Sequence, residues 1–424
     1  MDDRSALAWL ARRAGFGLAP MELDAQVVAG VASTLDRLVD PDRQGVAPAP
    51  DPWATLDLSG IDPRNVSNEL RGGVISGWLG AMATTPRPLM EWMRWFWHGH
   101  FVTSQTVVHD PRMIVTQLRM LGDLAMGDFR TLLRAVTVDP AMLVYLDGTR
   151  NRRHQLNENY AREVLELFSL GIGSFSEDDV GSSAHAFTGW YVDVRTGESR
   201  FAADRHDDTL QQYLGRAGVH DVETAIDAIV EQSACAPFIT ARLARALLGP
   251  EVDSGLIDRL AGEFRQSGLQ IRPLVRSILE VGLDGASTSM ITTPVPWAVA
   301  ASRATGFDLT ARPREVINAL RAAGQLPTVA PNVGGWPSGR AWLTSSATMA
   351  RVEMSGGLAA AAAIDNPARV AAAAGDLDGL ADALGRPEGF EPATRAGLRS
   401  LGSGPDRSSA VLTVALASPD LVVV

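Results

Sequence analysis

Two glutamates and an arginine lie in the segment of the chain richest in charged and amide side chains, NENYAREVLELFSLG at residues 157–171. Glu163 and Glu166 stand three residues apart, so on a helix they are neighbours on one face. Two carboxylates in this arrangement can act as general acid and general base, or can bind one divalent metal ion. Arg162 can orient an anionic group or pair with Glu166. The alternative interpretation is the solvated face of an amphipathic helix.

The element that positions these groups is a helix with its own start and stop. Asn157 can cap the first turn, Glu158 lies at the positive end of the helix dipole, and Gly171 can take the left-handed conformation that ends a helix. The polar face of this helix supplies the candidate site residues. The candidate catalytic residues are Glu158, Arg162, Glu163 and Glu166, and the candidate substrate contacts are Asn157 and Asn159.

A second unusual segment is the aromatic stretch PLMEWMRWFWHGHF at residues 88–101, which ends with His98 and His100. Its tryptophans predict a helix that is deeply buried or lines a pocket. Residues two apart on a continuous helix point about 200° apart and cannot share a metal ion. His98 and His100 are therefore candidate metal ligands only if Gly99 ends the helix between them. Otherwise one histidine caps the helix dipole and the other fills a polar niche in the core.

Three further positions are candidates for substrate binding. Asp147 precedes a basic loop at residues 150–154, directly before the polar helix. Trp336 and Arg340 lie in PNVGGWPSGRAW, a tight loop at residues 331–342 that can form one wall of a site. His206 and Asp207 follow a predicted hairpin and form a pair able to orient an imidazole, with an ordinary surface loop as the alternative.

Composition excludes several classes of function. The chain of 424 residues contains no lysine, which excludes ordinary pyridoxal phosphate chemistry and a P-loop nucleotide site. A single cysteine, Cys235, excludes an intrachain disulfide. The net charge of -11 argues against nucleic acid and anionic membranes as main partners.

The apolar runs are too short to span a membrane, which takes about 20 residues. Arg12 and Arg13 are followed by AGFGLAPMELDA rather than by the apolar stretch of an export signal. We therefore expect a cytoplasmic protein.

Helical periodicity over most of the chain predicts a mainly α fold, a large multi-helix domain over residues 1–424. A subdivision into residues 1–220, which hold most of the motifs, and residues 221–424 is the alternative. Residues 1–45 predict a helical hairpin, with 21–39 as one helix. Alternation around Thr196 and Gly197 predicts a small β-hairpin near residues 190–205.

Eight motifs, in order along nearly the whole chain, resemble a bacterial family known as domain of unknown function eighteen-hundred. The motifs are RRAGFG, PLMEWMRWFWHGHF, DPAMLVYLD, NENYAREVLELFSLG, AFTGW, RHDDTLQQYLG, PNVGGWPSGRAWL and ALASPDLV. The resemblance brings no established activity. Many relatives look exported and neighbour a sulfatase-like family, which implies envelope or polysaccharide biology. Where relatives usually have an arginine, this chain has His185, whereas the polar groups of the 157–171 helix match the family motif.

These observations favour a hydrolase or transferase that acts on a polar, glycan-like small molecule or oligosaccharide, assisted by carboxylates or by a divalent metal. We expect Glu163 and Glu166 to point into a pocket shared with His98 and His100. The alternative is a non-catalytic helical scaffold or binding protein, in which the polar helix forms a buried ion-pair network.

Overall fold

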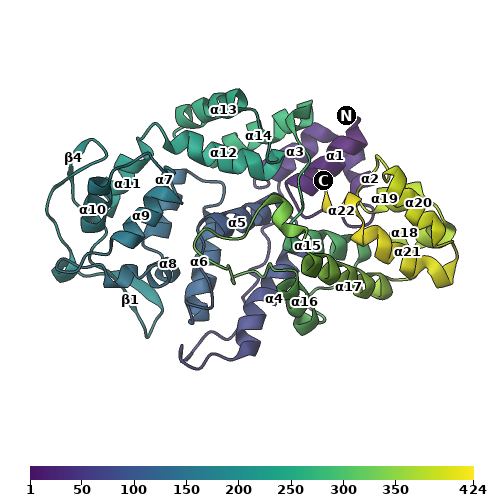
Figure 1. The fold of residues 1–424 in the computed structure, drawn as a ribbon, viewed down its shortest axis with the longest axis horizontal. Helices are drawn as coiled ribbons and strands as arrows, with labels where there is room; N and C mark the ends of the chain where they lie inside the picture. Colours follow the sequence, from purple (N-terminus) through teal and green to yellow (C-terminus); the bar gives the residue numbers. More distant parts are fainter.

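The computed structural model describes all residues from 1 to 424 and is built almost entirely of α-helices (Figure 1). Twenty-two α-helices are joined by loops, and the only β-structure consists of two two-stranded antiparallel sheets. This architecture confirms the predicted mainly α fold. None of the helices combines the length and the apolar composition needed to cross a membrane.

The elements follow one another in the order shown in Figure 1. The first helices are α1 (Asp3–Arg13), α2 (Glu22–Ala29), α3 (Val31–Val39), α4 (Asn68–Thr84), α5 (Pro88–His100), α6 (Pro111–Asp123), α7 (Phe129–Thr137) and α8 (Pro140–Tyr145). The middle of the chain forms η1 (Gly148–Arg150), α9 (Glu158–Glu166), α10 (Glu177–Ala186), β1 (Trp190–Asp193), β2 (Glu198–Phe201), η2 (Ala203–Arg205), β3 (Gln211–Tyr213), β4 (Arg216–Val219), α11 (Val222–Val230), α12 (Cys235–Leu248), α13 (Ser254–Gln266), α14 (Ile271–Val281) and η3 (Gly282–Ala286). The remaining elements are α15 (Pro294–Thr305), α16 (Pro313–Ala322), η4 (Gly339–Trp342), α17 (Ser345–Ala361), α18 (Pro367–Ala374), α19 (Leu377–Ala383), α20 (Pro392–Ser400), α21 (Pro405–Ala417) and α22 (Pro419–Val422).

Helix α5 lies near the middle of the molecule, between α7–α11 at one end and α17–α21 at the other (Figure 1). Its tryptophans Trp92, Trp95 and Trp97 are buried, and the Trp97 indole donates to the Ala125 carbonyl at 2.9 Å. The main hydrophobic core includes residues from Trp9 to Val422 and passes through this helix, and a small second cluster lies around Leu7 and Leu23. The aromatic segment is therefore an element of the core, since its indole surface is removed from water.

Polar caps fix where the helices around α5 begin. The side chains of Asp110, Asp128 and Asp139 accept hydrogen bonds from the first turns of α6, α7 and α8. Proline occupies the first position of α5, α6 and α8, where a missing N–H is tolerated. These local signals set the frame into which the polar helix α9 packs.

The predicted hairpin near residues 190–205 is confirmed, with Trp190 opposite Phe201 and Asp193 opposite Glu198 in the pair β1 and β2. The second hairpin, β3 with β4, was not predicted. It turns through Leu214 and Gly215, which both have positive φ, 50° and 81°. Leucine rarely takes this conformation. The turn also lacks the Asn-Gly, Asp-Gly or Gly-Gly pair that usually marks such a hairpin, which is why the sequence did not indicate it.

The prediction of one helix over residues 21–39 is wrong. Gly30 has φ 86° and ψ 158°, and it separates α2 from α3. Glycine reaches this conformation at little steric cost, so the chain can change direction at Gly30. The apolar periodicity continues through this position and therefore did not reveal the break between the two helices.

Candidate functional site

Helix α9 begins where the sequence predicts. The Asn157 side chain accepts from the backbone N–H of Asn159 at 3.1 Å and caps the helix. Its amide nitrogen donates to the carbonyls of Leu146, at 3.1 Å, and Asp147, at 2.9 Å. Both amide hydrogens and the amide oxygen of Asn157 therefore hold the helix start in place.

The two faces of α9 differ as the sequence predicts. Tyr160, Ala161, Val164 and Leu165 are buried, and the Tyr160 hydroxyl donates to the Thr137 carbonyl. Glu158 and Asn159 are exposed at the first turn. After α9, Gly171 has φ 82°, the left-handed conformation expected of it.

Arg162 pairs with a different carboxylate from the predicted one. Its guanidinium donates to both oxygens of Glu177 on α10, at 2.8 and 2.6 Å, and not to Glu166. A planar guanidinium matches two carboxylate oxygens at once, and Glu177 presents both of them from the neighbouring helix. The pairing of Arg162 with Glu166 is therefore wrong, and Glu166 is left without an ion-pair partner on α9.

Glu163 and Glu166 lie in different surroundings. Glu163 is half-buried beside Tyr145. This burial and the charge of Glu166 raise the pKa of Glu163, and the positive charge of Arg162 partly offsets that increase. Glu166 instead lines an open groove. Two neighbouring carboxyl groups in unlike environments are the usual arrangement of a general acid beside a base.

The groove has a volume of about 630 Å³ and lies between the end of α9 and the helices α12 and α13. Its polar side chains are Glu166, Arg242, Arg245, Ser254 and Asp258. Its apolar side chains are Leu167, Leu170, Ile172, Pro237, Phe238 and Ile257, with Ala234 and Ala241. A concave surface with an apolar floor and a few polar groups is typical of a small-molecule site.

His98 and His100 do not form a metal site with the two glutamates. Helix α5 continues to His100, so Gly99 does not end it and the two imidazoles point apart. His98 Nε2 accepts from the Thr328 backbone N–H at 3.1 Å, whereas His100 Nε2 donates to the Phe168 carbonyl at 3.0 Å. Burial lowers the pKa of each to about 3.

No group of three histidine, cysteine, aspartate or glutamate side chains is close enough to hold a metal ion anywhere in the chain. The residues present therefore do not fit the divalent metal expected from the sequence. His100 does reach the groove indirectly, because its Nδ1 accepts from Arg242 Nε at 3.4 Å. His98 lies instead against Trp78, with 5.2 Å between the ring centroids.

The loop that carries Trp336 covers the end of α5 and not the groove. Trp336 stacks on Trp95 with a centroid distance of 5.5 Å and an interplanar angle of 28°. Gly335, with φ 83°, lies so close to Gly99 that a Cβ there would come within 2.9 Å of the Gly99 carbonyl oxygen. Arg340 is exposed, and no residue of this loop lines the groove.

Asp147 also lies apart from the groove. It has φ 56°, precedes η1, and pairs with Arg150 at 3.4 Å on the surface. Of the residues predicted for the site, Glu166 alone lines the groove, and Glu163 lies one helical turn before it.

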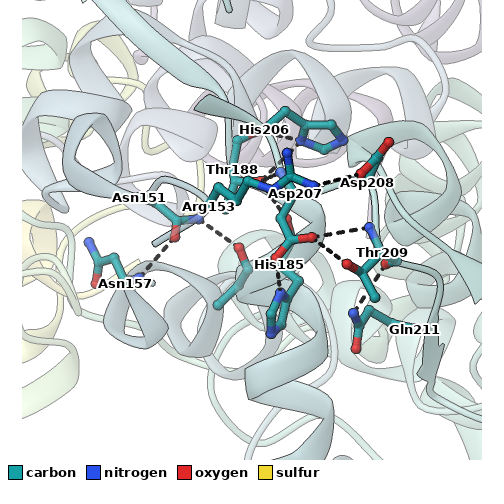
Figure 2. A network of polar contacts seen from close by, with 11 residues as sticks. Asn151, Arg153, Asn157, His185, Thr188, His206, Asp207, Asp208, Thr209 and Gln211 are labelled. Carbon is teal, nitrogen blue, oxygen red and sulfur yellow. Dashed lines mark hydrogen bonds and ion pairs between the residues drawn. The ribbon is translucent and has the colours of Figure 1, made fainter. Parts of the chain in front are cut away.

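Asp207 orients an imidazole, but that of His185 rather than that of its neighbour His206 (Figure 2). His185 Nδ1 lies 2.8 Å from the Asp207 carboxylate, which also accepts from the hydroxyl and backbone N–H of Thr209 at 2.6 and 3.1 Å. Hydrogen bonds from Thr209 and His185 lower the pKa of Asp207 to about 2. His206 turns its Nδ1 to Thr188.

Figure 2 places Asn151 and Asn157 in the same region as this pair. Asn151 is buried, donates to the Ala184 carbonyl at 2.8 Å and accepts from the Asn157 backbone N–H at 2.9 Å. The network thus joins the start of α9, the end of α10 and the chain after η2. The only signal for this position in the sequence was the family resemblance, which implies an arginine where this chain has His185.

Sequence reasoning missed Arg242 and Arg245. They lie three residues apart on α12, a helix with no acidic residue. An arginine pair with no carboxylate three or four residues away was the available signal, because such arginines cannot be neutralised within their own helix.

Comparison with known proteins gives one match. The model of a family described as "Protein of unknown function (DUF1800)" matches residues 9–423. No curated protein and no solved structure shows significant similarity to the chain.

Proposed function

Because the chain belongs to the DUF1800 family, which is described only as a protein of unknown function, we propose its activity from the geometry of its own residues. We propose that it is a hydrolase or transferase that acts on a polar, glycan-like substrate bound in the groove beside α9. Glu163 is the general acid and Glu166 is the general base.

The observation that carries this proposal is the position of Glu166 on the groove, one helical turn from Glu163. Burial and the adjacent charge raise the pKa of Glu163, which favours the protonated form that a general acid needs. Glu166 lines the groove, where its carboxylate can accept a proton from the substrate or from water. The apolar lining of the groove, which includes Phe238 and Ile172, supplies a surface for the carbon face of a sugar ring.

The test measures turnover of a panel of neutral and acidic oligosaccharides through the release of new reducing ends. Glu166→Gln and Glu163→Gln are expected to lower the rate by about a hundredfold or more, since a positioned acid or base contributes this much. Melting temperature is expected to stay unchanged, because neither carboxylate has a hydrogen-bond partner within the fold. Glu315→Gln, an exposed position on α16, is the matched control.

A second candidate function is a non-catalytic scaffold or binding protein. The bidentate pair of Arg162 with Glu177 favours it, because part of the polar face of α9 serves to hold α10. If Glu163→Gln and Glu166→Gln alter only the melting temperature, and no oligosaccharide is turned over, the scaffold is the correct reading and the enzyme proposal fails.

A further inference from the structure

Two arginines of α12 face the groove without a carboxylate partner. Arg242 and Arg245 both line it, one helical turn apart, and no acidic residue occurs anywhere in their helix. Glu166 and Asp258 line the same groove, but neither forms an ion pair with these arginines. Two like charges side by side repel each other, so the pair favours an anion from outside the chain.

Arg242 is also held in one orientation. Its Nε donates to His100 Nδ1 at 3.4 Å, and its guanidinium carbon lies 5.6 Å from the centroid of the Phe238 ring. The Phe238 contact is a cation–π arrangement, which fixes the plane of the guanidinium. With Nε occupied, both terminal nitrogens of Arg242 remain free of protein partners.

The tautomer of His100 follows from its contacts. A carbonyl oxygen can only accept, so the hydrogen lies on Nε2, which donates to Phe168. In a neutral imidazole the other nitrogen is then an acceptor, as the Arg242 contact requires. Burial and the adjacent guanidinium keep the ring neutral, because they lower its pKa to about 3. His100 is buried and packs against aromatic rings, including Phe96, Phe168 and Phe238.

We propose that Arg242 and Arg245 form an anion subsite in the groove, which binds a carboxylate or phosphate group of the substrate, and that His100 is the residue that positions Arg242. The inference rests on the proposed function for the identity of the groove as a substrate site. The free edge of a guanidinium donates two parallel hydrogen bonds to carboxylate or phosphate oxygens. The second arginine adds charge and a further donor.

This subsite narrows the substrate class. An anionic group held by Arg242 and Arg245 leaves the rest of the ligand along the apolar floor, toward Glu166. The ligand that fits is a sugar or short oligosaccharide with one acidic group, either a sugar carboxylate or a sugar phosphate. Neutral sugars lack the group that the two arginines would neutralise.

The experiment compares three probes of similar size, glucose, glucuronate and glucose 6-phosphate, by ligand-observed NMR and calorimetry with the purified full chain. Both anionic probes, or one of them, are expected to bind more tightly than glucose, and the difference between the two assigns the group to carboxylate or phosphate. Arg242→Ala and Arg245→Ala are each expected to weaken this binding by about tenfold, the loss of one charge-assisted hydrogen bond. Arg314→Ala, an exposed arginine on α16 without an ion-pair partner, is the matched control.

The role of His100 is tested through Arg242→Lys, which keeps the charge but removes both the Nε–H and the planar fork. If orientation matters, Arg242→Lys weakens binding about as much as Arg242→Ala does. Undiminished binding in Arg242→Lys would overturn the positioning role. His100→Gln, which retains a donor and an acceptor, is expected to keep more affinity than His100→Phe does.

Equal binding of all three probes, or binding that survives Arg242→Ala together with Arg245→Ala, would overturn the subsite. The measurement needs no turnover, so it separates the two proposals. Glucuronate binding that depends on the arginines, with no hydrolysis of any oligosaccharide, leaves the subsite standing and removes the catalytic proposal. Turnover that is lost in Glu166→Gln but unchanged in Arg242→Ala and Arg245→Ala would support the catalytic proposal and overturn the anion subsite.

Discussion

At the scale of single residues, the buried imidazoles of His98 and His100 make stability depend on pH. Burial lowers the pKa of each to about 3, whereas an unfolded histidine has a pKa near 6.5. Below pH ~6.5 the unfolded chain takes up protons at these imidazoles that the folded chain does not, so their contribution to stability is complete above this pH and is lost as the pH decreases toward 3. The Asp139 carboxyl, whose pKa burial raises to about 7, acts in the opposite direction.

Two imidazoles outweigh one carboxyl, so acidification from pH 6.5 to 4 is expected to lower the free energy of unfolding by about 1 kcal/mol per pH unit. Urea denaturation at a series of pH values measures this slope. His98→Gln is expected to remove most of this slope, because the remaining effect of His100 is then about equal and opposite to that of Asp139. A flat wild-type profile would contradict the assignment of this slope to the buried imidazoles.

Residue roles could be predicted where the cause is local. The cap at Asn157 and the left-handed Gly171 depend on the residues beside them, and the sequence contains both. The partners of Arg162 and His185 lie 15 and 22 residues away, on other elements. Periodicity along one helix cannot identify such partners, since they depend on how two elements pack.

At the scale of elements, the contact of His185 with Asp207 joins the end of α10 to the segment after η2 (Figure 2). Asp207 also accepts from the Thr209 hydroxyl, and its backbone N–H donates to the Thr188 hydroxyl, and neither bond involves the side chain at 185. The contact between α10 and the segment after η2 therefore needs a donor at position 185, and an arginine supplies one that is charged at every accessible pH.

His185→Arg is therefore expected to melt at or above the temperature of the wild type, whereas His185→Ala loses about 1 kcal/mol or more because the donor to a carboxylate is gone. Thermal unfolding followed by circular dichroism at neutral pH compares the two. If alanine and arginine at 185 give the same melting temperature, the contact with Asp207 contributes nothing to the joint.

Element boundaries were predictable where residue chemistry marks them. The β1–β2 turn contains Gly197, with φ 75°, and was found. The β3–β4 turn places Leu214 at positive φ and was missed, because tertiary packing and not turn preference holds it there. Gly30 was overlooked because the apolar pattern continues through it. A helix pattern alone does not report a break in the backbone.

At the scale of the whole molecule, the two ends of the chain are joined by a buried cation. Arg13 on α1 donates through one nitrogen to the carbonyls of Thr288, at 2.7 Å, and Val424, at 2.8 Å. Figure 1 shows both ends at the same side of the molecule. Burial and the neighbouring Arg12 lower the pKa of Arg13 to about 10, which still leaves it charged at neutral pH.

Arg13→Ala is expected to lower the free energy of unfolding by about 2 kcal/mol, because the charge-assisted hydrogen bonds from Arg13 to the backbone oxygens of Thr288 and Val424 are lost. Arg13→Met retains the apolar stem and separates packing from hydrogen bonding. If methionine restores full stability in urea denaturation, packing and not the hydrogen bonds joins the ends. Glucuronate binding is expected to be unaffected in both variants, since Arg13 lies outside the groove.

The groove itself could not be predicted at this scale. It needs the end of α9 to meet α12 and α13, whose lining residues lie between roughly 70 and 90 positions further along the chain than Glu166. Sequence chemistry identified Glu166 and the helix that carries it. We expected His98 and Trp336 in one site with Glu166, but these two side chains lie together at a separate place, with 5.5 Å between their ring centroids.

That separate place has an optical consequence. Trp95 and Trp336 are stacked indoles, so their electronic transitions couple and are expected to give a near-ultraviolet circular dichroism signal that depends on the distance between the rings. The groove contains no tryptophan. Movement of the 331–342 loop would thus change the near-ultraviolet circular dichroism spectrum of the protein, whereas a ligand in the groove would leave this signal unchanged. The loop can therefore be followed separately from the groove without any label.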